Sequence, residues 1–242
     1  MIAHRPSSYP RLVTPEIPED YEPHLDRVPI GVPGLDALVG GGLWRGSTTL
    51  VLGGTGTGKT TLGLQFALEG IKRGEGVLYV NFQENPVQLR RSIRNLGADP
   101  DRVYGEGFLR LYASPVELQI DSIIGAISDS VRQHAVRRVV VDALGDLAMA
   151  SDFRRMADYL YALCQFFVVH GVTSILLVES DSVSSARAQQ LPPISYVSDN
   201  VIVLSDTDVN PGRTLRVVKT RNSPHDTVAH PLQIDSNGVR VL

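Results

Sequence analysis

Residues 53–60 read Gly-Gly-Thr-Gly-Thr-Gly-Lys-Thr and satisfy the pattern GxxxxGK[ST]. Glycines let such a loop curl so that its backbone N–H groups converge on a phosphate at the positive end of the following helix. We expect Lys59 to contact the β- and γ-phosphates of a nucleotide, and the Thr60 hydroxyl to bind Mg²⁺. The predicted nucleotide-binding residues of this segment are Gly53, Gly54, Thr55, Gly56, Thr57, Gly58, Lys59, Thr60 and Thr61.

A glycine turn without a ligand is the alternative interpretation of this segment. The pattern arises by chance in about three of a thousand chains of this composition. Of the 23 lysine and arginine residues, only Lys59, Lys72 and Lys219 are lysine. A plain turn does not need one of three lysines, whereas a phosphate is well matched by a compact point charge. Lysine usage therefore favours a phosphate site.

A metal-binding partner for this loop is predicted at the end of a second apolar strand. Residues 139–141 are valines, and Asp142 follows them. In proteins with this type of loop, a carboxylate at such a strand end holds Mg²⁺, here through a water molecule. Many strands end in aspartate, so a helix cap is the alternative role. Because the loop requires an acidic partner, we assign Thr60 and Asp142 to the metal.

Strands and helices alternate around these residues. Apolar runs predict strands at 48–52, 76–82, 138–141 and 172–178, and helices at 59–72, 86–96 (with Gly97 as a C-cap), 116–131 and 153–170. Strands that are apolar on both faces and separated by helices indicate a parallel sheet covered on both sides. Strands at 200–204, 214–218, 232–234 and 239–242 are separated only by turns, which predicts an antiparallel extension at one end of the sheet.

The first 26 residues differ from the rest of the chain. They contain five prolines among scattered charges and show no sustained hydrophobic period. We interpret residues 1–26 as an extended or disordered arm and residues 27–242 as one α/β domain, since domains of this class reach about 250 residues.

Composition excludes several classes of protein. With 43% hydrophobic and 20% charged residues, the chain is neither fibrous nor wholly disordered. A formal net charge of -3 argues against a protein that coats nucleic acid. The single cysteine, Cys164, lies among apolar residues and is expected to be a buried, unreactive thiol. We see no signal peptide and no apolar run of about 18 residues, so we expect a cytoplasmic protein without a membrane segment.

Several segments resemble the KaiC domain of the RecA-like ATPases. They are 31–36 (GVPGLD), 40–43 (GGGL), 45–47 (RGS), the phosphate loop, 79–82 (YVNF), 198–204 (SDNVIVL) and 219–226 (KTRNSPHD). The likeness covers about residues 28–242 in the family's order, and the length fits one such domain, whereas KaiC carries two in tandem. An [NT]KxD element for guanine and an LSGGQ-like signature are absent, which argues against a GTPase and a transporter ATPase.

The resemblance implies a RecA-like P-loop core and a homo-oligomeric, hexameric ring with ATP held between neighbouring subunits. In the family, two cations of a late strand act in trans on the neighbour's phosphates, which here are Lys219 and Arg221. Ser223 and His225 match positions that hold the nucleotide across the same interface, and Asp235 with Ser236 lies near the base. The alternatives are an exposed face of an edge strand for Lys219 and Arg221, and ordinary turn polarity for the others.

One departure from the family concerns the residue that acts on water. The family usually carries paired glutamates after the second strand, where this chain has Gln83 and Glu84. A glutamine orients water but does not take its proton at neutral pH. We therefore assign the catalytic role to Glu84, together with Lys59, Lys219 and Arg221. Neighbouring strand residues point to opposite faces, so residues 83 and 84 share an orientation only if the strand has already ended.

Three functions follow from these observations. The first is a slow KaiC-like ATPase whose ring acts as a regulatory or signalling switch on a partner protein. The second, motivated by Gln83, is a non-hydrolysing scaffold in which ATP only holds the ring together. The third is a RecA-like ATPase that handles DNA, but residues 182–193 contain one cation, Arg187, and no aromatic residue for stacking bases. Nucleic acid is therefore not an expected partner.

Overall fold

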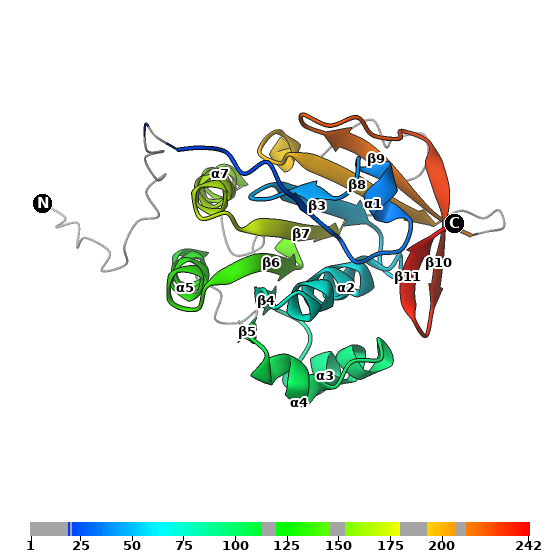
Figure 1. The fold of residues 1–242 in the computed structure, drawn as a ribbon, viewed down its shortest axis with the longest axis horizontal. Coiled ribbons are helices and arrows are strands. Elements are labelled where there is room, and N and C mark those ends of the chain that lie inside the picture. Colours follow the sequence, from blue (N-terminus) through cyan, green and yellow to red (C-terminus); the bar gives the residue numbers. More distant parts are fainter. Residues whose placement is uncertain (1–18, 20, 113–119, 146–152, 180–192, 207–211) are drawn as a thin grey trace, which may run out of the picture.

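The computed structural model describes residues 19, 21–112, 120–145, 153–179, 193–206 and 212–242. The described residues form a nine-stranded sheet with the strand order β11-β10-β9-β8-β3-β7-β6-β4-β5 (Figure 1). The strands are β3 (Thr48–Gly53), β4 (Gly76–Asn81), β5 (Phe108–Tyr112), β6 (Val136–Asp142), β7 (Thr173–Glu179), β8 (Asn200–Asp206), β9 (Arg213–Thr220), β10 (Ala229–Asp235) and β11 (Gly238–Val241). A separate two-stranded sheet pairs β1 (Arg27–Val28) with β2 (Leu43–Trp44).

The parallel part of the sheet separates two hydrophobic cores, as its two-sided apolar strands predict. The helices are α1 (Leu35–Leu38), α2 (Lys59–Lys72), α3 (Pro86–Asn95), α4 (Pro100–Gly105), α5 (Ile120–Gln133) and α7 (Phe153–Val169), with a 3₁₀ turn at Pro193–Tyr196. Alternate strand residues point to opposite faces. Val140 and Ile175 therefore pack in the core that contains α2 and α3, and Val139 and Leu176 in the core that contains α5 and α7.

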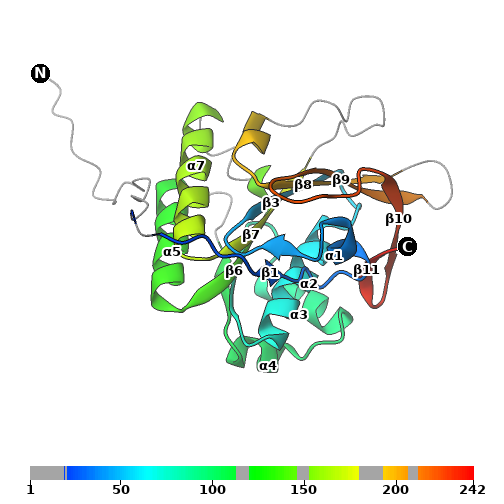
Figure 2. The ribbon, with the colours of Figure 1, turned by 45° about the horizontal axis from the view of Figure 1, so that its top comes forward.

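The antiparallel extension is confirmed. Strand β8 is parallel to β3, and β9, β10 and β11 then follow in antiparallel pairs. Figure 2 shows the β10–β11 hairpin on the side of the molecule opposite to α5 and α7. The chain thus has the RecA-like arrangement of a mostly parallel sheet with antiparallel strands at its C-terminal end.

Most predicted elements are confirmed within one or two residues. Helix α2 begins at Lys59 and ends at Lys72, and Gly97 follows the C-cap of α3 with a φ of 76°. Strand β5 and helix α4 were not predicted. Helix α5 is described from Ile120, so the predicted position 116 lies outside the described residues, as do 1–18 and 182–192.

Helix α2 is fixed to the sheet through a core that includes one buried cation. Arg138 of β6 is fully buried; its Nε lies 2.5 Å from Glu75 Oε2, and its Nη1 donates to the carbonyls of Pro29 and Phe66 at 2.8 and 3.0 Å. The absence of a side chain at Gly70 makes room for it, because a Cβ there would lie 2.6 Å from Arg138 Cδ. These contacts tie α2 to β6.

The described residues that precede β1 also contact the domain. Tyr21 Oη donates to the Val168 carbonyl at 3.0 Å, and Asp26 pairs with Arg45 at 2.6 Å. No helix in the described part of the chain has the length and apolar character needed to cross a bilayer.

Candidate nucleotide site

Four strand ends meet at one edge of the parallel sheet. In register, Gly53 of β3 lies opposite Glu179 of β7, and Asn81 of β4 lies opposite Asp142 of β6. The carboxyl ends of parallel strands border the crevice where α/β proteins bind ligands. The fold therefore brings the predicted phosphate loop and the predicted metal carboxylate to the same edge.

The phosphate loop has the backbone shape that its glycines predict. Gly56 and Gly58 have φ values of 81° and 101°, a region that costs little only for glycine. A Cβ at Gly58 would also lie 2.7 Å from Ile234 Cδ1, so the β10–β11 hairpin packs directly on the start of α2. Lys59 Nζ donates to the Gly54 carbonyl at 2.7 Å. The loop, the helix start and the lysine are thus arranged around one site.

Glu179 is a site residue that the sequence analysis missed. It ends β7, and its carboxylate accepts a hydrogen bond from the Thr55 hydroxyl of the phosphate loop. The signal was present in the sequence, since an acidic residue that ends an apolar strand is the same pattern that identified Asp142. The loop therefore has one more acidic neighbour than expected.

Asp142 is held in place by a buried tyrosine. Tyr79 Oη donates to Asp142 Oδ2 at 2.8 Å, and the tyrosine side chain is fully buried. Burial, together with the charge of Asp142, raises the pKa of Tyr79 well above its ordinary value, so the phenol stays protonated and remains a donor. An oriented carboxylate at the end of β6 and the Thr60 hydroxyl at the start of α2 are oxygen donors of the kind that Mg²⁺ prefers.

Glu84 lies in the turn at residues 82–85, after β4 has ended at Asn81. Because the strand has ended, residues 83 and 84 are not forced to opposite faces. Gln83 is exposed, whereas Glu84 is half-buried and its Oε2 is buried without a hydrogen-bond partner among the described residues. Burial, and secondly the charge of Asp142, raises the pKa of Glu84, while Arg110 lowers it in part. A carboxylate with a raised pKa and an unused oxygen is suited to accept a proton.

A cavity of about 350 Å³ opens beside the start of α2. It is lined by Thr60 and Thr61 of the helix and by Asp235 and Ser236 at the tip of the β10–β11 hairpin. Asp235 is exposed, accepts from the Asn237 N–H at 2.7 Å and lies 3.6 Å from Arg240. The structure therefore brings the predicted base-site residues next to the phosphate loop.

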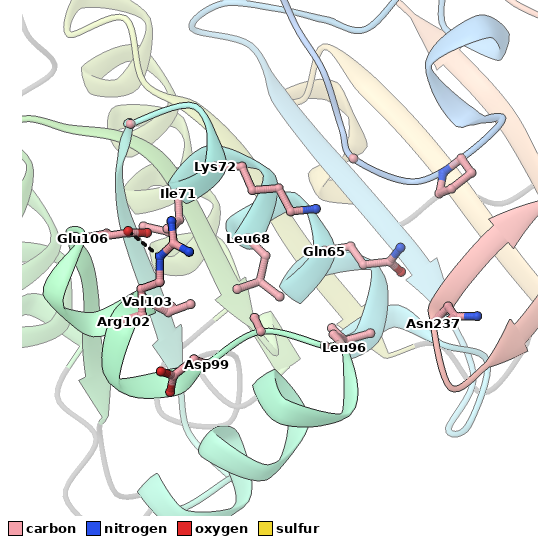
Figure 3. Close-up of a pocket in the computed structure, with 15 residues that line it drawn as sticks. Gln65, Leu68, Ile71, Lys72, Leu96, Asp99, Arg102, Val103, Glu106 and Asn237 are labelled. Carbon is pink, nitrogen blue, oxygen red and sulfur yellow. Dashed lines mark hydrogen bonds and ion pairs between the residues drawn. The ribbon is translucent and has the colours of Figure 1, made fainter.

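A second cavity of about 880 Å³ runs further along α2 (Figure 3). Leu68 and Ile71 line its apolar side, and Leu96 lines both cavities. Lys72, the last residue of α2, is exposed and borders this cavity. The larger cavity therefore borders the smaller one at Leu96 and is not lined by any residue of the phosphate loop.

The predicted trans residues lie at the opposite edge of the sheet. Lys219 Nζ donates to the carbonyls of Ser195 and Ser198 at 2.9 and 2.5 Å, and Arg221 Nη2 donates to the Tyr196 carbonyl at 2.8 Å. Asp199, which follows Ser198, accepts from the Thr48 N–H at 2.9 Å. This contact places the cations at the level of the first residue of β3.

Ser223 and His225 lie at this edge as well. The Ser223 hydroxyl accepts from Arg27 Nη2 at 2.7 Å, and His225 Nδ1 lies 2.8 Å from Thr220 Oγ1 at the end of β9. The predicted residues thus form two groups. One surrounds the phosphate loop, and the other lies about 16 Å away, because five residue steps of about 3.3 Å each lead along β3 from Thr48 to Gly53.

Comparison with known proteins identifies the family. The model of the KaiC ATPase family matches residues 28–242. The circadian clock protein KaiC3 of Synechocystis sp. is 31% identical over 238 residues, which cover 90% of this chain and 46% of KaiC3. A UPF0273 protein of Methanopyrus kandleri is 30% identical over 238 residues, with 92% of its length covered. This chain therefore spans about half the length of KaiC3 and nearly all of the Methanopyrus protein.

A solved structure agrees with these sequence matches. The crystal structure of a KaiC-like protein from the archaeon Pyrococcus horikoshii aligns with a TM-score of 0.77 and 29% identity, over 90% of this chain and 99% of that one. With a phosphate loop, a strand-end aspartate and a RecA-like sheet in place, the chain belongs to the KaiC family of ATPases.

Proposed function

We propose that this chain is a slow ATP hydrolase that forms a ring, in which each nucleotide is held by the phosphate loop of one subunit and contacted by Lys219 and Arg221 of the next. The observation that carries this proposal is the separation of the two groups of residues within one chain. Neither cation reaches its own phosphate loop across about 16 Å of sheet. A head-to-tail contact between copies joins the two groups and, if it closes, generates a ring.

The chemistry of the two groups is complementary. The loop N–H groups and Lys59 bind the β- and γ-phosphates, and cations from the neighbour stabilise the charge that develops on the transferring phosphoryl group. Thr60 and Asp142 would hold Mg²⁺, which neutralises phosphate charge when bound. Glu84 takes a proton from the attacking water as its oxygen bonds to the γ-phosphorus and the bond to ADP breaks. Phosphate and ADP are then the products.

The base side of the site supports adenine binding. The smaller cavity lies beside Thr60 and Thr61 and offers the Asp235 carboxylate and the Ser236 hydroxyl. A carboxylate accepts hydrogen bonds, and the exocyclic amine of adenine donates them. We therefore place the base between the start of α2 and the tip of the β10–β11 hairpin.

The proposed role of the ring is regulatory or signalling, because an enzyme with slow turnover is better suited to a switch than to bulk ATP consumption.

The second candidate is an ATP-dependent scaffold that does not hydrolyse its ligand. It is supported by Gln83, which is exposed and lacks the basicity of the family's glutamate. In this role ATP still joins the subunits through both groups of residues, but Glu84 has no catalytic function.

Two measurements on the full chain separate these candidates. Light scattering after size exclusion, with and without ATP and Mg²⁺, is expected to show a species near six times the 26.3 kDa chain mass. Phosphate release is expected to exceed that of a Lys59→Ala control and to fall to a small residual rate in Glu84→Gln. Release no higher than in the control, with ring formation intact, supports the scaffold. A protein that stays monomeric with ATP contradicts both.

A further inference from the structure

The turn that carries Glu84 is fixed by a residue of the edge strand β5. Arg110 Nε donates to Asn81 Oδ1 at 3.3 Å, and Arg110 Nη2 donates to the Glu84 carbonyl at 3.3 Å. Asn81 Nδ2 donates to the same carbonyl at 2.7 Å. The Glu84 backbone therefore accepts two hydrogen bonds from side chains of two different strands.

The other end of the turn is fixed by the start of α3. Asn85 caps this helix by accepting from the N–H groups of Val87 and Gln88 at 2.9 and 3.0 Å, and the Gln88 side chain accepts from the Asn85 N–H at 2.9 Å. This capping box holds the residue directly after Glu84. The backbone is therefore held on both sides of the Glu84–Asn85 peptide bond. Arg110 and Asn81 bind the Glu84 carbonyl, and the capping box binds Asn85.

We propose that Arg110 is a positioning residue for Glu84, which acts by holding the backbone of the turn so that the carboxylate stays at the carboxyl end of β4. The inference rests on the proposed hydrolysis and adds the device that allows one glutamate to serve where the family has two. A base that works alone needs an accurate position, since a displacement of about 1 Å costs about 100-fold in rate.

The direction of the hydrogen bonds is consistent with this role. Arg110 bonds to the backbone carbonyl of Glu84, and Glu84 Oε2 has no hydrogen-bond partner in the described part of the chain. A guanidinium bonded directly to the carboxylate would occupy the lone pairs that accept a proton. The guanidinium also lies 4.8 Å from the ring centroid of Tyr112, which restrains it.

Arg110→Ala tests the proposal, with Arg91→Ala as a matched control. Arg91 is exposed on α3 and makes no hydrogen bond or ion pair with described residues, so its loss removes a nearby cation without touching the turn. We expect Arg110→Ala to lower kcat at least about tenfold with KM for ATP within about twofold, because the base moves and the phosphate loop does not. Arg91→Ala is expected to leave both constants unchanged.

A double variant shows whether Arg110 acts through Glu84. In a Glu84→Gln background, Arg110→Ala should cause no further loss of the residual rate. A full tenfold loss in that background, an unchanged kcat in the single variant, or a loss confined to KM contradicts the proposal. If the alanine variant fails to fold, Arg110→Lys serves instead, since it keeps the charge and the apolar stem but lacks the planar fork that bridges two acceptors.

Hydrogen exchange measured by mass spectrometry separates this inference from the proposed hydrolysis. Peptides that contain residues 82–85 are expected to exchange faster in Arg110→Ala than in Arg91→Ala. If the unmodified chain releases no phosphate above the Lys59→Ala control, the proposed hydrolysis fails while the exchange result still decides whether Arg110 fixes the turn. Equal exchange in both variants overturns the inference.

Discussion

Mixing two inactive variants tests whether the active site is shared between subunits. The first variant, Lys59→Ala, has a defective phosphate loop and intact cations. The second, Lys219→Ala with Arg221→Ala, has an intact loop and no cations on the late strand. If the cations act on the neighbour, an active site forms wherever a subunit of the second variant receives cations from a subunit of the first.

The expected size of the effect follows from the structure. In one chain the cations lie about 16 Å from the loop, and a unit charge at that distance in water contributes about 0.3 kcal/mol, or less than a twofold change in rate. A cation in contact with the transferring phosphoryl group contributes about 1,000-fold or more. We therefore expect the cation variant alone to lose at least about 100-fold in kcat.

Recovery in the mixture gives the second magnitude. When the two variants are mixed equally and exchange freely, about a quarter of the interfaces pair an intact loop with intact cations. Phosphate release is then expected to return to about a quarter of the unmodified rate. As a control, the cation variant mixed with a triple variant, which carries all three substitutions, forms no complete site. A mixture no more active than this control, or a cation variant that loses less than twofold, refutes the shared site.

Three further predictions concern single residues. Glu84 must be ionised to accept a proton, and burial and the charge of Asp142 raise its pKa above the ordinary value of 4.5. As the pH is lowered, the turnover rate should therefore begin to fall before the pH reaches 4.5. A turnover rate that stays constant down to pH 4.5 contradicts this role. Burial raises the pKa of the Cys164 thiol to about 12, so a thiol reagent at pH 8 should label it only in urea, and rapid labelling of the native chain would count against its burial. Arg138→Met should lower the free energy of unfolding in urea by about 3 kcal/mol because Glu75 and two carbonyls lose their donor. The exposed neighbour Arg137→Ala should change it by less than about 0.5 kcal/mol, and equal effects would show that the buried contacts contribute little.

The phosphate loop and its flanking elements could be predicted because each is determined locally. Glycines, a lysine and an apolar helix follow one another directly, so the spacing alone predicted α2 from Lys59 to Lys72. Asp142 was predicted from a carboxylate that follows an apolar strand, whereas Glu84 was assigned from the paired glutamates of the family it resembles. The outer parts of the sheet were harder. Strand β5 was missed because it is short and Arg110 interrupts its apolar run.

Helix α4 was missed although its start signal is present. Asp99 is the N-cap, accepting from the Asp101 N–H at 3.1 Å, and Pro100 occupies the first helical position. Its six residues contain too few apolar positions to show a helical period. Arg110 was missed for a different reason. It lies 26 residues after Glu84 in the sequence, and the two residues meet only because β5 pairs with β4.

The distance between the two groups of site residues could not be predicted from the sequence either. It depends on the register of β8 and β9, which places Thr220 opposite Asn200 and Asn200 opposite Thr49 at the start of β3. A register shifted towards the carboxyl end of β3 would bring the same cations closer to the loop. The resemblance to the family implied action in trans, and the separation of the two groups in the sheet is a physical reason to expect it.

Gly70 and Arg138 restrict the order in which this core can change during evolution. Any side chain at position 70 meets the arginine, with Cβ only 2.6 Å from its Cδ, so enlarging the glycine first is strongly disfavoured. Losing the arginine first leaves Glu75 without its 2.5 Å partner and two carbonyls without a donor. Each single step lowers stability, whereas a combined exchange to a larger apolar residue at 70 and a shorter one at 138 need not. Substitutions at positions 70 and 138 are therefore expected to be epistatic. Among related sequences the two residues should either change together or both stay as glycine and arginine.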